Sequence, residues 1–182
     1  MSAMDPLFVI PSLVTAIAAI IDWRTGHIPN RLVFWGLVAG LAARFAVAAP
    51  QSERSLGLLN SAAEIGLGLL VCAAVPLVLF RMGAMGGGDV KLLAVLGACA
   101  GPSVGMRIQV CAFMVGALLA AVMLARTGQL SRLLRNVGIL LLNPFLPRAR
   151  RREIEPAMLT SLRFGPAICA ATLWVGAETW FS

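Results

Sequence analysis

Long apolar runs recur along the whole 182-residue chain and are separated by shorter polar stretches. Most of these runs approach the roughly 20 residues that a helix needs to cross the hydrocarbon core of a bilayer. Only 13% of the residues are charged, whereas about a quarter are charged in a typical soluble domain. Because backbone groups in lipid must find their hydrogen-bond partners within the protein, such runs fold as helices. The sequence therefore predicts an all-α integral membrane protein.

The apolar runs predict a compact bundle of about six transmembrane helices in a single domain, residues 1–182. The expected segments are 6–22, 32–49, 62–80, 89–100, 108–125 and 164–181. Trp23–Arg31 and Pro50–Asn60 are predicted as polar connections, and Gly101-Pro102 as a turn.

The stretch 126–163 is rich in arginine and is predicted to be a cytoplasmic loop. Within it, apolar residues recur at helical spacing between Ser131 and Pro147, with Arg132 and Arg135 among them. This pattern indicates an amphipathic helix on the cytoplasmic membrane surface. A seventh membrane span is the alternative, although it would be short and would carry arginines.

The positions of the basic residues predict the orientation of the chain. Most of the 15 Lys and Arg residues follow the first, third and fifth segments. The positive-inside rule places these loops in the cytoplasm and both termini in the periplasm. Because the net charge of +7 follows this topology, nucleic acid is not an expected partner. The cluster Arg148–Arg152 is expected to contact anionic lipid headgroups.

Two aspartates are placed at the cytoplasmic ends of predicted segments. Asp22 ends the first segment, and Asp89 begins the fourth segment directly after Gly86-Gly87-Gly88. An ionisable group at membrane depth is costly, which makes it a candidate functional residue. Two crossings separate the aspartates, so they return to the same side, where helix packing would bring them together.

Two neighbouring carboxylates share a proton, so that one activates a water molecule while the other acts as an acid. This arrangement hydrolyses a peptide bond without a covalent intermediate. The plainer alternatives are a helix-end charge for Asp22, paired with a loop arginine, and a helix N-cap for Asp89. His27 is expected to be a polar loop residue, the four cysteines to be small apolar residues, and neither a metal nor a cofactor is expected.

Four short motifs together resemble the type IV prepilin peptidase family, the intramembrane aspartic proteases with a G-x-G-D signature. The motifs are Asp22-Trp23-Arg24, Ile28-Pro29-Asn30, Gly86–Leu92 and Phe164–Ala167. The resemblance implies that Asp22 and Asp89 are the catalytic aspartates. It also implies a multi-pass protein of the bacterial inner membrane that removes the short basic leader of single-span prepilins at the cytoplasmic face.

The cysteine pattern indicates which form of the family the chain resembles. Full-size members carry a cytoplasmic domain with paired C-x-x-C zinc motifs and also N-methylate the new N-terminus. This chain has four cysteines and no C-x-x-C pair. It therefore resembles the short, peptidase-only members that serve tight-adherence (Flp-type) pilus systems, and no N-methylation is expected.

Residues around the aspartates are expected to support the site. Gly86, Gly87 and Gly88 would let substrate backbone approach Asp89, or would form only a flexible turn. Lys91 would alter the Asp89 pKa or extend to lipid phosphates. The remaining candidates are Pro29 and Asn30, which would fix the loop after the first segment, and Gly165 and Pro166, which would break the sixth segment or simply start it.

Two other classes of function are compatible with the same residues. A small proton-coupled membrane transporter would use Asp22 and Asp89 as a proton relay. A non-catalytic assembly subunit of a secretion system would need neither carboxylate. Cleavage of a leader by the wild-type protein and its loss on replacing either aspartate distinguish a peptidase from both.

Overall fold

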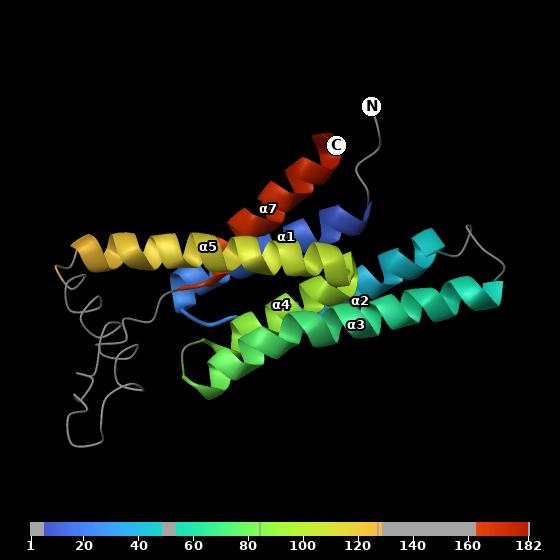
Figure 1. Cartoon of the computed structure of the whole chain (residues 1–182), viewed down its shortest axis with the longest axis horizontal. Coiled ribbons are helices and arrows are strands. Elements are labelled where there is room, and N and C mark those ends of the chain that lie inside the picture. Colours follow the sequence, from blue (N-terminus) through green and yellow to red (C-terminus); the bar gives the residue numbers. More distant parts are fainter. Residues whose placement is uncertain (1–5, 49–53, 84, 127, 129–162, 182) are drawn as a thin grey trace, which may run out of the picture. The chain divides into compact units, whose positions relative to one another are not determined.

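The computed structural model describes residues 6–48, 54–83, 85–126, 128 and 163–181. Every regular element in these ranges is an α-helix, which confirms the predicted fold class. The helices, drawn in Figure 1, are α1 (Pro6–Thr25), α2 (Asn30–Ala48), α3 (Arg54–Arg81), α4 (Gly87–Ala100), α5 (Pro102–Arg126) and α7 (Gly165–Phe181).

Four of these helices are long and apolar enough to cross a membrane. The qualifying stretches are Phe8–Thr25 in α1, Asn30–Val47 in α2, Leu59–Arg81 in α3 and Pro102–Arg126 in α5. The other two are shorter, with 14 residues in α4 and 17 in α7. At 1.5 Å per residue α4 is about 21 Å long, which is less than the ~30 Å thickness of the hydrocarbon core.

Several helix ends differ from those expected from hydropathy. Arg54–Asn60 belongs to α3, although it was expected to be part of a polar connection. Likewise, Trp23–Thr25 extends α1, and Asn30 and Arg31 begin α2. A helix continues into polar sequence where its backbone bonds are still made, whereas hydropathy reports only the apolar part. The α5 helix starts at Pro102 rather than near residue 108, because proline is well suited to the first helical position.

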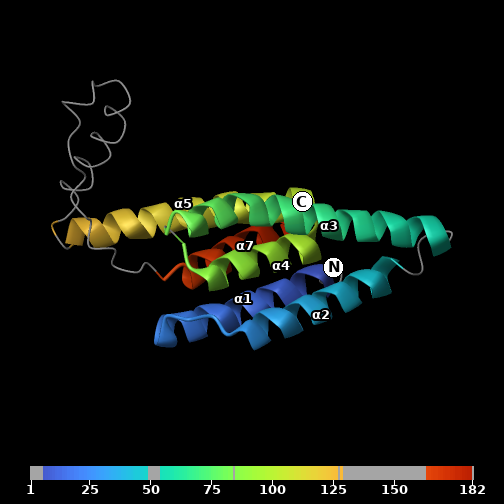
Figure 2. The ribbon, with the colours of Figure 1, turned by 90° about the horizontal axis from the view of Figure 1, so that it is seen from below.

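Backbone contacts divide the chain into two units. The first comprises Met1–Val115 with Arg163–Ser182, and the second is Gly116–Leu162. In the first unit α3 lies along α4, α7 lies along α1, and α2 contacts both α1 and α4 (Figures 1 and 2). The described part of the second unit is the C-terminal half of α5 and Gly128. The predicted loop 126–163 and its amphipathic helix lie almost entirely outside the described residues.

The short helix α4 is the buried element of the first unit. Its apolar side chains Leu92, Leu93 and Leu96 are at most 2% exposed. Backbone also meets backbone at α4, since a Cβ added to Gly68 of α3 would lie 2.0 Å from the carbonyl oxygen of Gly97. Small residues at helix crossings allow this close approach. The depth of α4, and hence of Asp89, is therefore fixed by its neighbours.

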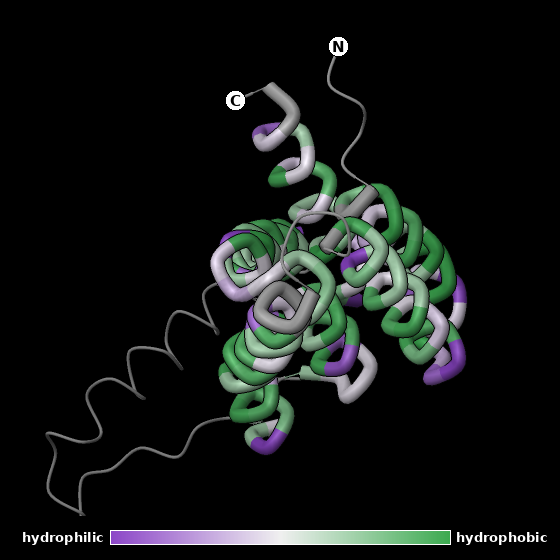
Figure 3. Tube along the Cα trace, turned by 90° about the vertical axis from the view of Figure 1, so that its right-hand side faces the viewer, coloured by the Kyte–Doolittle hydropathy of each residue, from purple (hydrophilic) through white to green (hydrophobic). Residues whose placement is uncertain are grey.

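The described helices consist mostly of apolar residues, as the green tube in Figure 3 shows. Large exposed side chains include Leu70, Met114, Leu173 and Trp174, each more than half exposed. In water such a surface would cause association, whereas in a bilayer it is the surface that contacts lipid. The burial pattern thus agrees with a multi-pass membrane protein.

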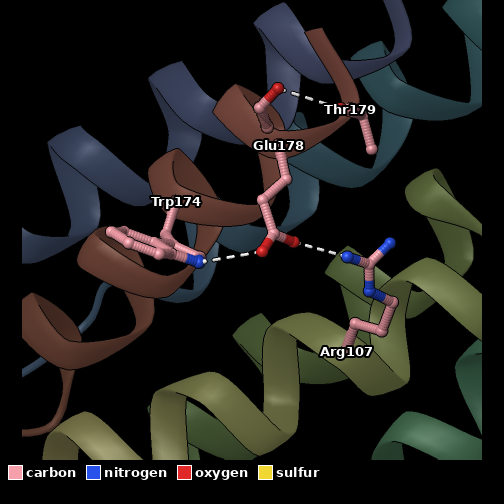
Figure 4. A network of polar contacts seen from close by, with 5 residues as sticks. Arg107, Trp174, Glu178 and Thr179 are labelled. Atoms are coloured by element: carbon pink, nitrogen blue, oxygen red, sulfur yellow. Dashed lines mark hydrogen bonds and ion pairs between the residues drawn. The ribbon is translucent and has the colours of Figure 1, made fainter. Parts of the chain in front are cut away.

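Polar contacts join helices at the C-terminal end of α4. Arg44 of α2 pairs with Glu64 of α3 and donates a hydrogen bond of 3.0 Å to the carbonyl oxygen of Cys99 in α4. Near the start of α5, Arg107 pairs with Glu178 of α7, which also accepts a bond from Trp174 (Figure 4). These contacts lie at the opposite end of α4 from Asp89.

Candidate active site

Asp22 lies in the last turn of α1 and is 6% exposed. The helix ends three residues later, where Gly26 has a φ of 68° and donates its N–H to the Asp22 carbonyl oxygen at 2.8 Å. A left-handed glycine directly after the last helical residue is a common way to end a helix. Thr25-Gly26 thus ends α1 just after Asp22 and turns the chain into the loop that contains Ile28 and Pro29 and leads to Asn30, the first residue of α2.

Asp89 is the third residue of α4 and is 9% exposed. The N-cap position belongs to Gly86, whose backbone is extended, so the N-cap alternative for Asp89 does not apply. The Asp89 carboxyl instead accepts a hydrogen bond from the Gly86 N–H, as an acidic residue at the third position does in a capping box. Its Oδ1 is buried and has no hydrogen-bond partner within the described part of the chain.

The two aspartates lie at the same end of the bundle and interact electrostatically. The negative charge of Asp22 acts on the Asp89 carboxyl, and α1 packs against α4. The sequence predicted from topology that these two residues meet, and their role as a catalytic pair stays a prediction.

Neither carboxyl forms an ion pair with a basic side chain among the described residues. Arg24, Arg31, Arg81 and Arg163 are exposed. The ion pairs found among the described residues are Arg44–Glu64 and Arg107–Glu178, and neither includes Asp22 or Asp89. The described residues therefore do not form the alternative arrangement, in which Asp22 would pair with a loop arginine.

The first turn of α7 meets the end of α1 at Asp22. The Gly165 N–H donates a hydrogen bond of 3.0 Å to Asp22 Oδ2. The α7 helix begins at Gly165, so Gly165-Pro166 starts this helix and does not break it. Phe164, just before the helix, packs its ring against Phe113 of α5 with centroids 5.7 Å apart. Sequence analysis included Gly165 among the supporting residues but did not foresee its contact with Asp22.

The loop between α1 and α2 contacts the start of α4. A Cβ added to Gly88 would lie 2.9 Å from the Cβ of Ile28, which is 3% exposed. Beside it, Lys91 Nζ donates a hydrogen bond of 2.8 Å to the side-chain oxygen of Asn30. Lys91 thus joins α4 to α2, a role that was not among those expected for it. Ile28 was missed as a site residue, although a single apolar residue in a polar loop is a signal of burial.

The three glycines before Asp89 differ in their surroundings. Gly87 faces the ring of Phe80, since a Cβ added to Gly87 would lie 3.3 Å from the nearest ring carbon, and Gly88 faces Ile28. Gly86 is exposed, while Gly87 and Gly88 are half-buried. Two of the three glycines therefore allow close packing within the chain itself, and Gly86 is the one open to another molecule.

The remaining candidates have local roles. The Pro29 carbonyl oxygen accepts the N–H of Leu32 at 3.1 Å in the first turn of α2. His27 is exposed and its N–H donates to Thr25 Oγ1 at 3.3 Å. Within the described ranges, no group of three His, Cys, Asp or Glu side chains is arranged to hold a metal ion.

The profile of a known protein family covers well over half of the chain. Residues 8–125 match the profile of the type IV leader peptidase family, a range that includes both aspartates and ends before α7. Searches of curated proteins and of solved structures found no match. Because the matched range is well over half of the chain, the chain belongs to the type IV leader peptidase family and is an aspartic prepilin peptidase.

Proposed function

We propose that this leader peptidase uses Asp22 and Asp89 as its catalytic pair to release the basic leader of a prepilin. The observation that carries the proposal is the burial of two interacting carboxyls, from α1 and α4, with no cation paired to either among the described residues. Such a pair is costly to bury and is the arrangement that aspartic proteases use.

Hydrolysis by this pair needs one water molecule and one shared proton. The ionised carboxylate takes a proton from the water, whose oxygen attacks the peptide carbonyl carbon. The protonated carboxyl donates its proton to the carbonyl oxygen. When the tetrahedral intermediate collapses, the C–N bond breaks and the amine leaves with the proton first taken from water. A hydroxyl of the intermediate returns a proton to the second carboxylate, which restores the pair. The buried Asp89 Oδ1, which lacks a partner within the described chain, is available for a bond to the water or to the peptide carbonyl.

Gly86 is the point at which we expect substrate backbone to approach. Gly86 is exposed and directly precedes the turn that carries Asp89, whereas Gly87 and Gly88 pack against Phe80 and Ile28. An extended peptide gains main-chain hydrogen bonds when it lies along exposed backbone. Replacing Gly86 would hinder this approach, and an added Cβ would also lie 3.0 Å from Asp89 Oδ2.

The finer assignment is a Flp-type prepilin as substrate, with no N-methylation. Its support is the absence of C-x-x-C pairs from the sequence, which separates this chain from the methylating form. The arrangement of Lys and Arg supports a chain in the bacterial inner membrane with both termini in the periplasm and the aspartates at the cytoplasmic side. Cleavage at that side matches a substrate whose leader is cytoplasmic.

Co-expression with a Flp-type prepilin precursor tests the proposal. Wild-type protein should shorten the precursor, and Asp22→Asn and Asp89→Asn should each abolish this while reaching the membrane in normal amounts. Asp5→Asn, which replaces the one other aspartate in the sequence, is the matched control, and this variant should cleave the precursor normally. Cleavage by either active-site variant would reject the paired mechanism, and a proton-relay transporter would leave the precursor intact in every strain.

The mass of the mature pilin tests the second part of the proposal. A mass equal to that of the unmodified cleaved chain supports the peptidase-only form. An additional methyl group, present with wild-type protein and absent without it, would contradict that assignment while leaving the peptidase assignment in place.

A further inference from the structure

One backbone amide in the first turn of α7 donates a hydrogen bond to Asp22, a member of the proposed catalytic pair. In this turn the N–H groups of Ala167 and Ile168 both bond to the Phe164 carbonyl oxygen, at 3.0 and 3.1 Å. Pro166 has no N–H. The remaining amide, that of Gly165, donates to Asp22 Oδ2 at 3.0 Å. The first amides of a helix lack partners inside it, and here one of them binds Asp22.

Glycine at position 165 is explained by space and not by a left-handed backbone. Gly165 is not among the described glycines with positive φ. Alanine is favoured over glycine within a helix by about 1 kcal/mol. A Cβ at this position would, however, lie 2.8 Å from Asp22 Oδ2 and 2.9 Å from Asp22 Cβ. The position therefore excludes a side chain because Asp22 occupies that space.

Packing along α7 holds this turn in place independently of Asp22. Ala167, Ile168, Ala171 and Val175 are at most 1% exposed. At the other end of the α1–α7 contact, Gly176 faces Phe8, so the two helices run antiparallel with Asp22 at one end and Phe8 at the other. A turn fixed in this way can orient the carboxylate that binds to it.

We propose that Gly165 is a positioning residue: its N–H holds Asp22 Oδ2, so that the other oxygen of Asp22 is directed to the proton it exchanges with water. The proposal rests on the proposed function of Asp22. It adds α7, which lies beyond the matched range 8–125, to the apparatus that sets the geometry of hydrolysis. Gly165 itself touches neither substrate nor water in this role.

The first test is a kinetic comparison of two alanine substitutions in the same helix. Gly165→Ala pushes against Asp22, whereas Gly176→Ala places its Cβ 3.4 Å from Phe8, an ordinary contact. A misplacement of about 1 Å at a reacting group can cost ~100-fold in rate, so kcat of Gly165→Ala for prepilin cleavage should fall by about that factor. KM should stay near the wild-type value, since substrate binding is not removed. Gly176→Ala should match wild type in both constants.

A second test does not depend on peptidase activity. The chain has only three aspartates, Asp5, Asp22 and Asp89, so protein carrying carboxyl-¹³C aspartate gives three signals, which single Asn substitutions assign. At a fixed neutral pH, Gly165→Ala should move the Asp22 signal, and Gly176→Ala should leave it unchanged. An Asp22 signal that stays in place in folded Gly165→Ala would overturn the proposal.

Replacing the amide at residue 165 by an ester removes the donor without adding a Cβ. This variant covers the case in which Gly165→Ala does not fold. Its control is the same ester at Ala167, whose N–H bonds inside the helix. The ester at 165 should lower kcat, and the ester at 167 should not. Equal rates for the two esters would assign residue 165 a structural role alone.

The outcomes for Gly165 and for the aspartates are separable. If Asp22→Asn or Asp89→Asn still cleaves, the proposed function fails. If both are inactive while Gly165→Ala cleaves at the wild-type rate, the catalytic pair stands and only the positioning role of Gly165 is refuted.

Discussion

Gly68→Ala is the most informative test of how the bundle fixes the depth of Asp89. A Cβ at Gly68 would lie 2.0 Å from the carbonyl oxygen of Gly97 and 2.7 Å from its carbonyl carbon. Contacts below 3.0 Å are essentially never made by real Cβ atoms. The backbones of α3 and α4 must therefore separate by about 1 Å, because neither atom belongs to a side chain that can rotate away.

The expected loss follows from two opposing terms. Forcing a methyl group into a packed interior costs typically 1–3 kcal/mol, and a backbone clash places this variant at the upper end. Alanine recovers up to about 1 kcal/mol through its helix propensity. We therefore expect a net loss of roughly 2 kcal/mol in the free energy of unfolding, with a reduced rate of prepilin cleavage because α4 carries Asp89.

The matched control is Gly66→Ala, the same substitution two residues earlier in α3. A Cβ at Gly66 meets nothing within 4 Å, so this variant should be as stable as wild type or slightly more stable. Thermal unfolding in one detergent, followed for both variants and wild type, measures the difference, and cleavage of the same precursor measures its consequence. Equal unfolding temperatures for Gly68→Ala and Gly66→Ala would refute the close contact between α3 and α4.

Four further substitutions test individual contacts. Arg44→Met should lower the free energy of unfolding by about 2 kcal/mol, because it leaves a carbonyl oxygen at the end of α4 without its donor. Arg107→Met changes a side chain that is 55% exposed and should cost at most ~1 kcal/mol. Chemical denaturation of the two variants and wild type measures both losses. Gly88→Ala should reduce prepilin cleavage because its Cβ would displace Ile28, and wild-type activity would contradict that contact. Lys91→Met removes an exposed hydrogen bond to α2 and should lower stability by under ~1 kcal/mol, as an unfolding curve would reveal.

Hydropathy and topology predicted the helical fold and the common location of the two aspartates. Apolar runs mark where a chain enters lipid, and counting crossings returns Asp22 and Asp89 to one side. The same signal misplaced the start of α3, because Arg54–Asn60 is helical without being apolar. Hydropathy indicates which part of a helix lies in lipid, but it does not locate the ends of the helix.

The contacts around the aspartates could not be predicted from the sequence. A glycine is compatible with a turn, with an approach by substrate or with a helix crossing, and only the packing distinguishes Gly88 against Ile28 from the exposed Gly86. The pairing of Lys91 with Asn30 depends on where α2 begins, which hydropathy placed two residues too late. The bond from Gly165 to Asp22 joins helices at opposite ends of the chain, and no local pattern encodes it.

Carboxyl titration of the ¹³C-aspartate protein tests most directly whether Asp22 and Asp89 act on one another. Interacting acids titrate as a pair, so Asp89→Asn should change the titration curve of Asp22, Asp22→Asn should change that of Asp89, and Asp5→Asn should change neither. Curves for Asp22 and Asp89 that are the same with and without the other residue would contradict the account.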